Sequence, residues 1–143
     1  MSPVIENPDA YRKPLPVPSA LTAPYWQAAA EGRLLIQECR SCGHLQFYPR
    51  GHCLSCGAGD PSWRVASGCG TLHTFSVIHR SGMPGFTEEV PYVFAIVELE
   101  EGPRMSTNLV GVDVEQIVVD MPVQATFTQI SDELGIPQFT KAV

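Results

Sequence analysis

The second half of the chain alternates apolar and polar positions with the period of β-strands. The clearest segments are TLHTFSVIHR at 71–80, YVFAIVELE at 92–100, RMSTNLVGV at 104–112 and PVQATFTQI at 122–130. The second of these is apolar on both faces, which is typical of a strand in a closed barrel packed beneath another element. About five strands in roughly 75 residues predict a small Greek-key barrel of the OB type.

The connections between these strands are rich in glycine and proline. SGMPGFTEEVP at 81–91 is a long loop, and GDPSWRVASGCG at 59–70 is dense in turn residues. DVEQIVVD at 113–120 fits one helical turn or a strand, and the pattern does not choose between them.

The N-terminal segment is an arm followed by a short helix. Residues 1–24 hold six of the thirteen prolines, which predicts an extended arm, either a free tail or a segment that lies on a partner. Ala28–Ala30 favour a helix that Ser19 or Thr22 can cap and Gly32 can end. A helix of about eight residues is not stable alone, so we expect Tyr25 and Trp26 to dock on a partner. The six prolines of the arm are Pro3, Pro8, Pro14, Pro16, Pro18 and Pro24. After the helix, RLLIQEC at 33–39 predicts a strand.

Acidic residues outnumber basic ones. Nine Lys and Arg face fifteen Asp and Glu, which gives a formal net charge of −6 at pH 7. Proteins that neutralise many phosphates are basic, so the charge argues against nucleic acid. No apolar run approaches the ~20 residues of a membrane span, and the N-terminus lacks the pattern of a signal peptide. We therefore expect a cytoplasmic protein, and a hydrophobic content of 44% is enough for a core.

Four of the five cysteines lie in CRSCGHLQFYPRGHCLSCG at 39–57. Two Cys-x2-Cys pairs, separated by ten residues, predict two metal-binding turns that face each other. A glycine closes each turn, because it can adopt positive φ and let backbone N–H groups point at the thiolates. The predicted site is a tetrahedral cage for Zn²⁺. The predicted ligands are Cys39, Cys42, Cys53 and Cys56.

A closed site with four thiolates has no open position for water, so we interpret it as structural. Iron in a rubredoxin-like site stays an alternative, since thiolates bind both metals. Disulfides or a thioredoxin-like pair are disfavoured, because the βαβ context is missing. His44 and His52 flank the site and are interpreted as exposed residues of the ribbon.

The fifth cysteine, Cys69, has His73 and His79 near it in sequence. A nucleophile needs a base and an electropositive pocket, and an inert thiol is the favoured interpretation. The sequence contains no Ser/His/Asp signature, glycine-rich phosphate loop or paired-carboxylate motif. We therefore expect no catalytic apparatus in this chain.

The order of these motifs resembles one protein family. EGRLLIQEC, the cysteine segment with FYPR at its centre, SGCGTLHTFSVIH, PYVFAIVELEEGPRMSTNLVG and MPVQATF resemble the acyl-CoA-associated zinc-ribbon and OB-fold proteins, catalogued as domain of unknown function thirty-five. The resemblance covers roughly residues 20–130. It departs at Cys69, where the family usually has another small or charged residue.

The resemblance implies a mainly β protein with an N-terminal helical arm, a rubredoxin-like zinc ribbon and a C-terminal OB-fold barrel. We place these at residues 1–32, 33–62 and 63–143. It also implies an accessory subunit of a thiolase-like enzyme, an enoyl-CoA hydratase or an aldolase, with the thiolase ranked first. Such a subunit binds an acyl-CoA thioester, whose phosphates need a few arginines. The candidates are Arg80, Arg50, Arg104 and Arg64, with Phe86 and Met83 as possible covers for the acyl chain or adenine.

Two functions from other classes stay open at this point. Ribbon plus OB barrel also occurs in modules that bind single-stranded nucleic acid, where aromatic side chains stack on bases. A rubredoxin-like electron carrier would be coloured, because iron thiolates absorb visible light and zinc thiolates do not.

Overall fold

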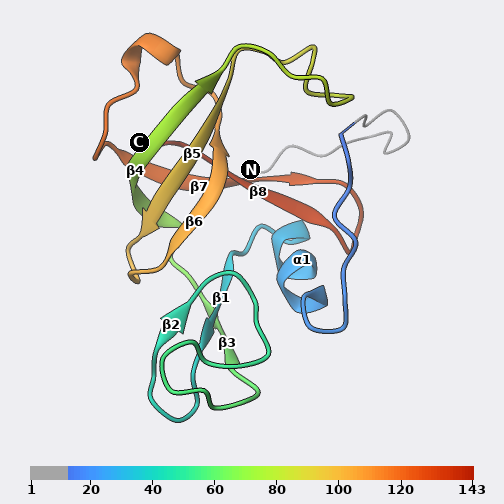
Figure 1. The fold of residues 1–143 in the computed structure, drawn as a ribbon, viewed down its shortest axis with the longest axis vertical. Coiled ribbons are helices and arrows are strands. Elements are labelled where there is room, and N and C mark those ends of the chain that lie inside the picture. Colours follow the sequence, from blue (N-terminus) through green and yellow to red (C-terminus); the bar gives the residue numbers. More distant parts are fainter. Residues whose placement is uncertain (1–12) are drawn as a thin grey trace.

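The computed structural model describes residues 13–143 (Figure 1). Pro3 and Pro8 of the predicted arm lie outside the described residues. Residues 14–18 form neither helix nor strand, as the prolines predict. The elements are α1 (Ala23–Ala30), β1 (Leu35–Glu38), β2 (Leu45–Gln46), β3 (Ser62–Val65), β4 (Cys69–Ile78), β5 (Tyr92–Leu99), β6 (Arg104–Leu109), the 3-10 helix η2 (Val114–Gln116), β7 (Pro122–Gln129) and β8 (Gly135–Lys141).

Helix α1 begins and ends where the sequence predicts. Thr22 is its N-cap residue, and the turn before it is closed by two bonds: the Ser19 N–H donates to Thr22 Oγ1 at 2.9 Å, and the Thr22 N–H donates to Ser19 Oγ at 3.2 Å. At the other end Gly32 has φ +80°, and its N–H donates to the Ala29 carbonyl at 3.1 Å. Positive φ is easy for glycine, so Gly32 ends the helix.

The ribbon is a three-stranded antiparallel sheet in the order β2-β1-β3. β1 lies in the centre, with Gln37 opposite both Gln46 of β2 and Trp63 of β3. The strand β3 falls in the segment 59–70, for which the sequence predicts turns only. Its pairing with β1 outweighs the flanking prolines and glycines, because β1 provides a full ladder from Leu35 to Glu38.

The barrel is closed, with strand order β4-β5-β6-β8-β7. Together with the helix and ribbon it confirms the predicted mainly β fold with an OB-type barrel. Its last strand, β8, was not predicted. Figure 1 shows the barrel above the ribbon, with α1 beside β8. η2 resolves the ambiguous segment 113–120 in favour of a short helical turn.

The barrel interior is formed by alternate residues of its strands. On β5 the buried residues are Val93, Ala95, Val97 and Leu99, and each is at most 4% exposed. The intervening Phe94 is 42% exposed. The outer face of this strand is therefore exposed at Phe94, whereas Tyr92 and Ile96 on the same face are half-buried.

The linker between ribbon and barrel is fixed by the turn that joins β5 and β6. The Ser67 N–H donates to Glu101 Oε2 at 2.7 Å, and the Ser67 hydroxyl donates to Glu100 Oε2 at 2.8 Å. Both bonds involve a carboxylate and are stronger than neutral ones. These bonds connect the segment between β3 and β4 to the turn between β5 and β6.

Among residues 13–143, no helix has the length and apolar character needed to cross a membrane.

Candidate metal centre and the groove beside it

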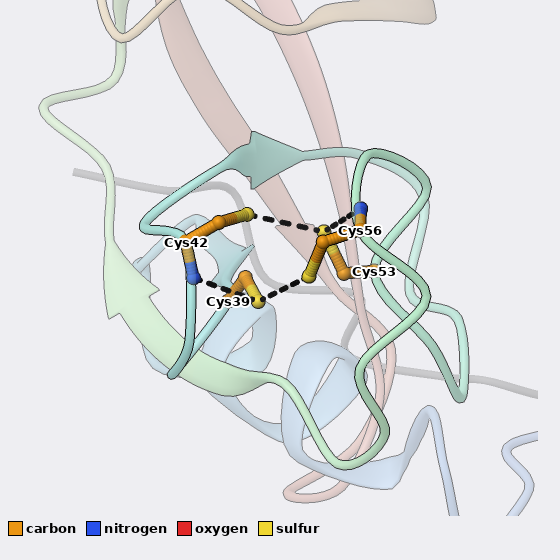
Figure 2. A group of neighbouring side chains, drawn as sticks. All are labelled: Cys39, Cys42, Cys53 and Cys56. Carbon is orange, nitrogen blue, oxygen red and sulfur yellow. Dashed lines mark hydrogen bonds between the residues drawn. The ribbon is translucent and has the colours of Figure 1, made fainter.

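The two Cys-x2-Cys turns face each other, as the spacing predicts (Figure 2). The four Sγ atoms lie within 4.8 Å of one another. Cys39 and Cys56 have their sulfurs 3.6 Å apart, as do Cys42 and Cys53. One cysteine of each turn, Cys39 and Cys53, is buried, and the other is exposed.

These distances fit a tetrahedral metal. With a Zn–S bond of ~2.3 Å, the ligand sulfurs of a tetrahedron are ~3.8 Å apart. A disulfide requires an S–S distance of ~2.05 Å, so the geometry opposes two disulfides. The donor set and its shape therefore fit Zn²⁺, held by these four cysteines as a closed site.

The backbone of each turn is folded around one sulfur. The N–H groups of Ser41 and Cys42 donate to Cys39 Sγ, both at 3.4 Å. In the second turn the N–H groups of Ser55 and Cys56 donate to Cys53 Sγ at 3.3 and 3.5 Å. Gly43 and Gly57 follow, with φ of +75° and +80°. The two turns are therefore equivalent, and each requires its glycine.

These N–H groups favour thiolates. They lower the pKa of Cys39 to about 6, with the N–H of Cys42 as the largest cause and that of Ser41 next. The pKa of Cys53 is also lowered, first by the N–H of Cys56. For Cys42 the N–H of His44 lowers the pKa, but partial desolvation and hydrogen bonds with the neighbouring thiols outweigh it and raise the pKa to about 12. A bound metal ion deprotonates its cysteine ligands outright.

His44 and His52 are exposed and do not belong to the cluster that the described residues form. His44 contributes through its backbone: its N–H points at Cys42, and its carbonyl accepts from the Cys39 N–H at 2.9 Å. The His52 carbonyl accepts from Gln46 Nε2 at 3.0 Å. Both histidines therefore help to shape the ribbon without acting as ligands.

A buried pair of glutamines, which the sequence analysis missed, connects the metal turn to the rest of the ribbon. Gln37 and Gln46 are 1% and 4% exposed. Gln46 Nε2 donates to Gln37 Oε1 at 2.9 Å, and Gln46 Oε1 accepts from the Leu54 N–H, next to Cys53, at 2.9 Å. Gln37 Oε1 also accepts from the Arg50 N–H at 2.8 Å, and its Nε2 donates to the Arg50 carbonyl at 2.9 Å. The available signal was a glutamine inside the apolar run RLLIQEC.

Replacing Gln37 with methionine is expected to lower the free energy of unfolding by about 2 kcal/mol, because the buried Gln46 amide and the backbone groups of Arg50 lose their partner. Chemical denaturation of the zinc-loaded protein measures this change. The matched control is Gln27→Met on the exposed face of α1, expected to stay within about 0.5 kcal/mol of the original. Equal stability of the two variants would show that the glutamine network is dispensable.

A groove of about 480 Å³ lies where helix, ribbon and barrel meet. It is lined by the start of α1, the ribbon segment after β2, residues 104–108 of β6 and residues 136–137 of β8. Its volume is in the range of small-molecule sites. We call it the aromatic groove, because four aromatic rings form one of its walls.

The four rings are in contact with one another. Tyr25 is 4.8 Å from Trp26, 5.6 Å from Phe47 and 5.6 Å from Tyr48, measured between ring centroids. Tyr25 is only 3% exposed, whereas Tyr48 is 38% exposed. Tyr25 therefore packs inside the chain and supports Trp26 and Tyr48, the outer members of the cluster.

The predicted CoA residues fall in two places. Arg50 and Arg104 both line the aromatic groove. Arg104 Nε also contacts Glu98 Oε1 at 3.2 Å, an exposed ion pair. Arg80 is exposed after β4 and does not line the groove, and Arg64 pairs with Glu38 at 3.4 Å on the ribbon sheet.

Phe86 belongs to a separate contact in the loop 79–91, where Met83 is exposed. Its ring lies 5.3 Å from that of Tyr92, and Lys13 Nζ is 5.0 Å from its centroid. Lys13 Nζ also pairs with Glu89 at 2.7 Å. Lys13 therefore contacts this loop, whose residues do not line the aromatic groove.

Cys69 is exposed at the start of β4. Its backbone N–H donates to the Ser67 hydroxyl at 3.1 Å. No hydrogen bond joins its thiol to a histidine within the part of the chain that the structure describes, so the arrangement provides no activating base.

The sequence profile of the ChsH2 rubredoxin-like zinc ribbon domain matches residues 26–62, and that of the ChsH2 C-terminal OB-fold domain matches residues 63–128. A DUF35 domain-containing scaffold protein of Methanocaldococcus jannaschii is 34% identical over 110 residues, which are 76% of this chain and 77% of that protein. The chain belongs to this family of zinc-ribbon and OB-fold proteins. The match confirms the predicted resemblance.

Two further relatives are linked to enzymes by name. A solved structure described as Ltp2-ChsH2(DUF35) aldolase is 38% identical to this chain, with a TM-score of 0.79, and the match covers 90% of this chain and 99% of that one. A probable enoyl-CoA hydratase alpha subunit of Thermomonospora curvata is 38% identical over 96% of this chain. This chain spans only 42% of that hydratase subunit.

Proposed function

We propose that this chain is a non-catalytic subunit of an acyl-CoA enzyme complex in the cytoplasm. It docks on a partner enzyme and holds part of the coenzyme A moiety of the substrate. The observation that carries this proposal is the likeness to the DUF35 chain of an aldolase, which extends over 99% of that chain.

The aromatic groove is the proposed coenzyme A site. Coenzyme A is a small molecule with phosphates at one end, and a groove with two arginines and aromatic walls matches both features. Arg104 can exchange its exposed Glu98 partner for a phosphate at little cost, because exposed ion pairs contribute only about 0–1 kcal/mol. Arg80 and Phe86 are not part of this proposal, because neither lines the groove.

The proposed partner contact includes Trp26. This ring lies at the rim of the aromatic groove and is supported from within by Tyr25. Tyr48 at 38% and Leu54 at 62% are exposed on the adjoining ribbon. Large rings on a rigid base are typical of interface anchors. A partner bound here would cover the groove and complete the coenzyme A site.

An aldolase or a hydratase is the partner class that the named relatives favour over a thiolase. Nucleic acid is not favoured. Fifteen Asp and Glu against nine Lys and Arg leave few cations for the phosphates of a nucleic acid. Arg104 is the one cation of β5 and β6, the strands on whose face OB barrels bind oligonucleotides.

A tagged form of this chain, expressed in its own host, is expected to capture one partner in a one-to-one ratio. Mass spectrometry identifies the captured protein, and the expected result is an aldolase or hydratase acting on CoA thioesters. Capture of a thiolase would correct the partner class only. A chain that is isolated alone, or with nucleic acid, would contradict the proposed function.

A further inference from the structure

The barrel closes between β6 and β8 at a single position. β6 pairs with β5 at six positions, and β8 pairs with β7 at seven. Between β6 and β8, Leu109 opposite Phe139 is the one recorded pair in the described chain, and the Val110 N–H donates to the Phe139 carbonyl at 2.8 Å. Residues 104–108 of β6 therefore form an unpaired strand edge along the aromatic groove.

Two residues of β8 explain why the ladder stops. In this parallel register the next pair would be Thr107 opposite Pro137, and it would need an N–H that proline lacks. Two residues earlier, Gly135 packs on α1 so closely that a Cβ atom there would lie 2.3 Å from the carbonyl carbon of Ala29. β8 therefore leaves β6 and follows α1.

The backbone of the open edge faces the groove. The Leu99 N–H donates to the Pro103 carbonyl at 2.8 Å, which sets the alternation of the β5–β6 ladder. In that alternation Met105 and Thr107 bond to β5, and the N–H and C=O groups of Arg104 and Ser106 point the other way. Ser106 is exposed, so a ligand in the groove can reach its backbone.

We propose that this open edge binds the pantetheine arm of coenzyme A as if it were an added strand. The arm is thin and carries two amides, each with the N–H and C=O of a peptide, and these can continue a β-ladder. Arg50 and Arg104 line the same groove and suit the phosphates to which the arm is attached. The inference rests on the proposed function, because it takes coenzyme A as the ligand.

The length of the edge suits this ligand better than a polypeptide strand. Residues 104–108 extend about 14 Å at ~3.4 Å per residue, which offers a few backbone groups only. The opposite wall contains Pro137 and lacks a donor there, so an inserted peptide would be bonded mainly from one side. The two amides of the pantetheine arm need only the hydrogen bonds that the β6 side of the groove provides.

The test removes the Ser106 N–H and keeps the strand. Proline is tolerated on an edge where its nitrogen faces outward, so Ser106→Pro deletes this donor, and Ser106→Ala is the control that retains it. Calorimetry with the zinc-loaded full chain measures the binding of CoA, pantetheine and adenosine 3′,5′-bisphosphate. For Ser106→Pro we expect about tenfold weaker binding of CoA and of pantetheine. Binding of the bisphosphate stays unchanged, and Ser106→Ala resembles the original chain.

A second variant gives an independent result. Pro137→Ala supplies the missing N–H, so the β6–β8 ladder can extend to Thr107 and close the groove. We expect about tenfold weaker CoA binding with an unchanged or higher melting temperature.

Three outcomes would overturn the inference: no CoA binding by the original chain, unchanged CoA affinity in both Ser106→Pro and Pro137→Ala, or loss of partner capture in Ser106→Pro with CoA binding intact. The last would identify a peptide strand as the occupant and leave the proposed function standing. The proposed role as a subunit of an acyl-CoA enzyme is tested separately, and it fails if the original chain captures no enzyme of CoA thioesters.

Discussion

Replacing Cys53 with serine is expected to unfold the ribbon and to abolish capture of the partner enzyme. Structural zinc sites of this kind have apparent binding free energies of ~10–16 kcal/mol at pH 7, and in a small ribbon this is folding free energy. Cys53 is buried, and two backbone N–H groups point at its sulfur, so serine cannot restore the site. Metal content, thermal melting and capture of the partner measure the effect together.

The matched control for this experiment is Cys69→Ser. Cys69 is exposed and lies outside the metal cluster, so this variant should keep its zinc, its melting temperature and the activity of the complex. A loss of more than about 100-fold in that activity would identify Cys69 as a nucleophile. Capture of the partner at the original level by metal-free Cys53→Ser would contradict the structural role of the metal.

Replacing Gly135 with alanine is expected to lower the free energy of unfolding by about 3 kcal/mol or more. The added Cβ would meet the Ala29 carbonyl carbon and the Ala30 nitrogen at 2.3 Å, and these are backbone atoms of a helix that cannot move aside singly. Overpacking of a close contact typically costs about 1–3 kcal/mol, and this contact is closer than side-chain atoms ever approach. Chemical denaturation measures the loss.

The same variant should widen the aromatic groove, because α1 and β8 both line it. Its control is Gly82→Ala in the loop 79–91, where an added Cβ meets no atom within 4 Å. This substitution is expected to be neutral or slightly stabilising. If the two alanine variants have equal stability, the close packing of α1 on β8 does not contribute to the fold.

The fold could be predicted wherever the local pattern and the tertiary structure agree. The cysteine spacing is sufficient to predict the metal cluster, because two Cys-x2-Cys turns have few other uses in a chain of this type. The helix Ala23–Ala30 is followed directly by Gly32, whose positive φ ends it. In these places neighbouring residues alone contain the information.

The rest depends on contacts between distant segments. β8 contains Gly135 and Pro137, both unfavourable in strands, and it forms because β7 supplies seven partners. β3 lies among turn residues and is stabilised by β1. The same holds for the site: Arg50 and Arg104 were predicted as separate candidates, and only the packing of ribbon on barrel places them in one groove.

The neighbouring strands of the closed barrel are paired over very unequal lengths. β4 and β5 are joined at eight positions and β7 and β8 at seven, whereas β6 and β8 meet at one. The edge of β6 beside the aromatic groove is already open along residues 104–108, so a long ligand can approach it from the side along its whole length and need not be threaded in by one end.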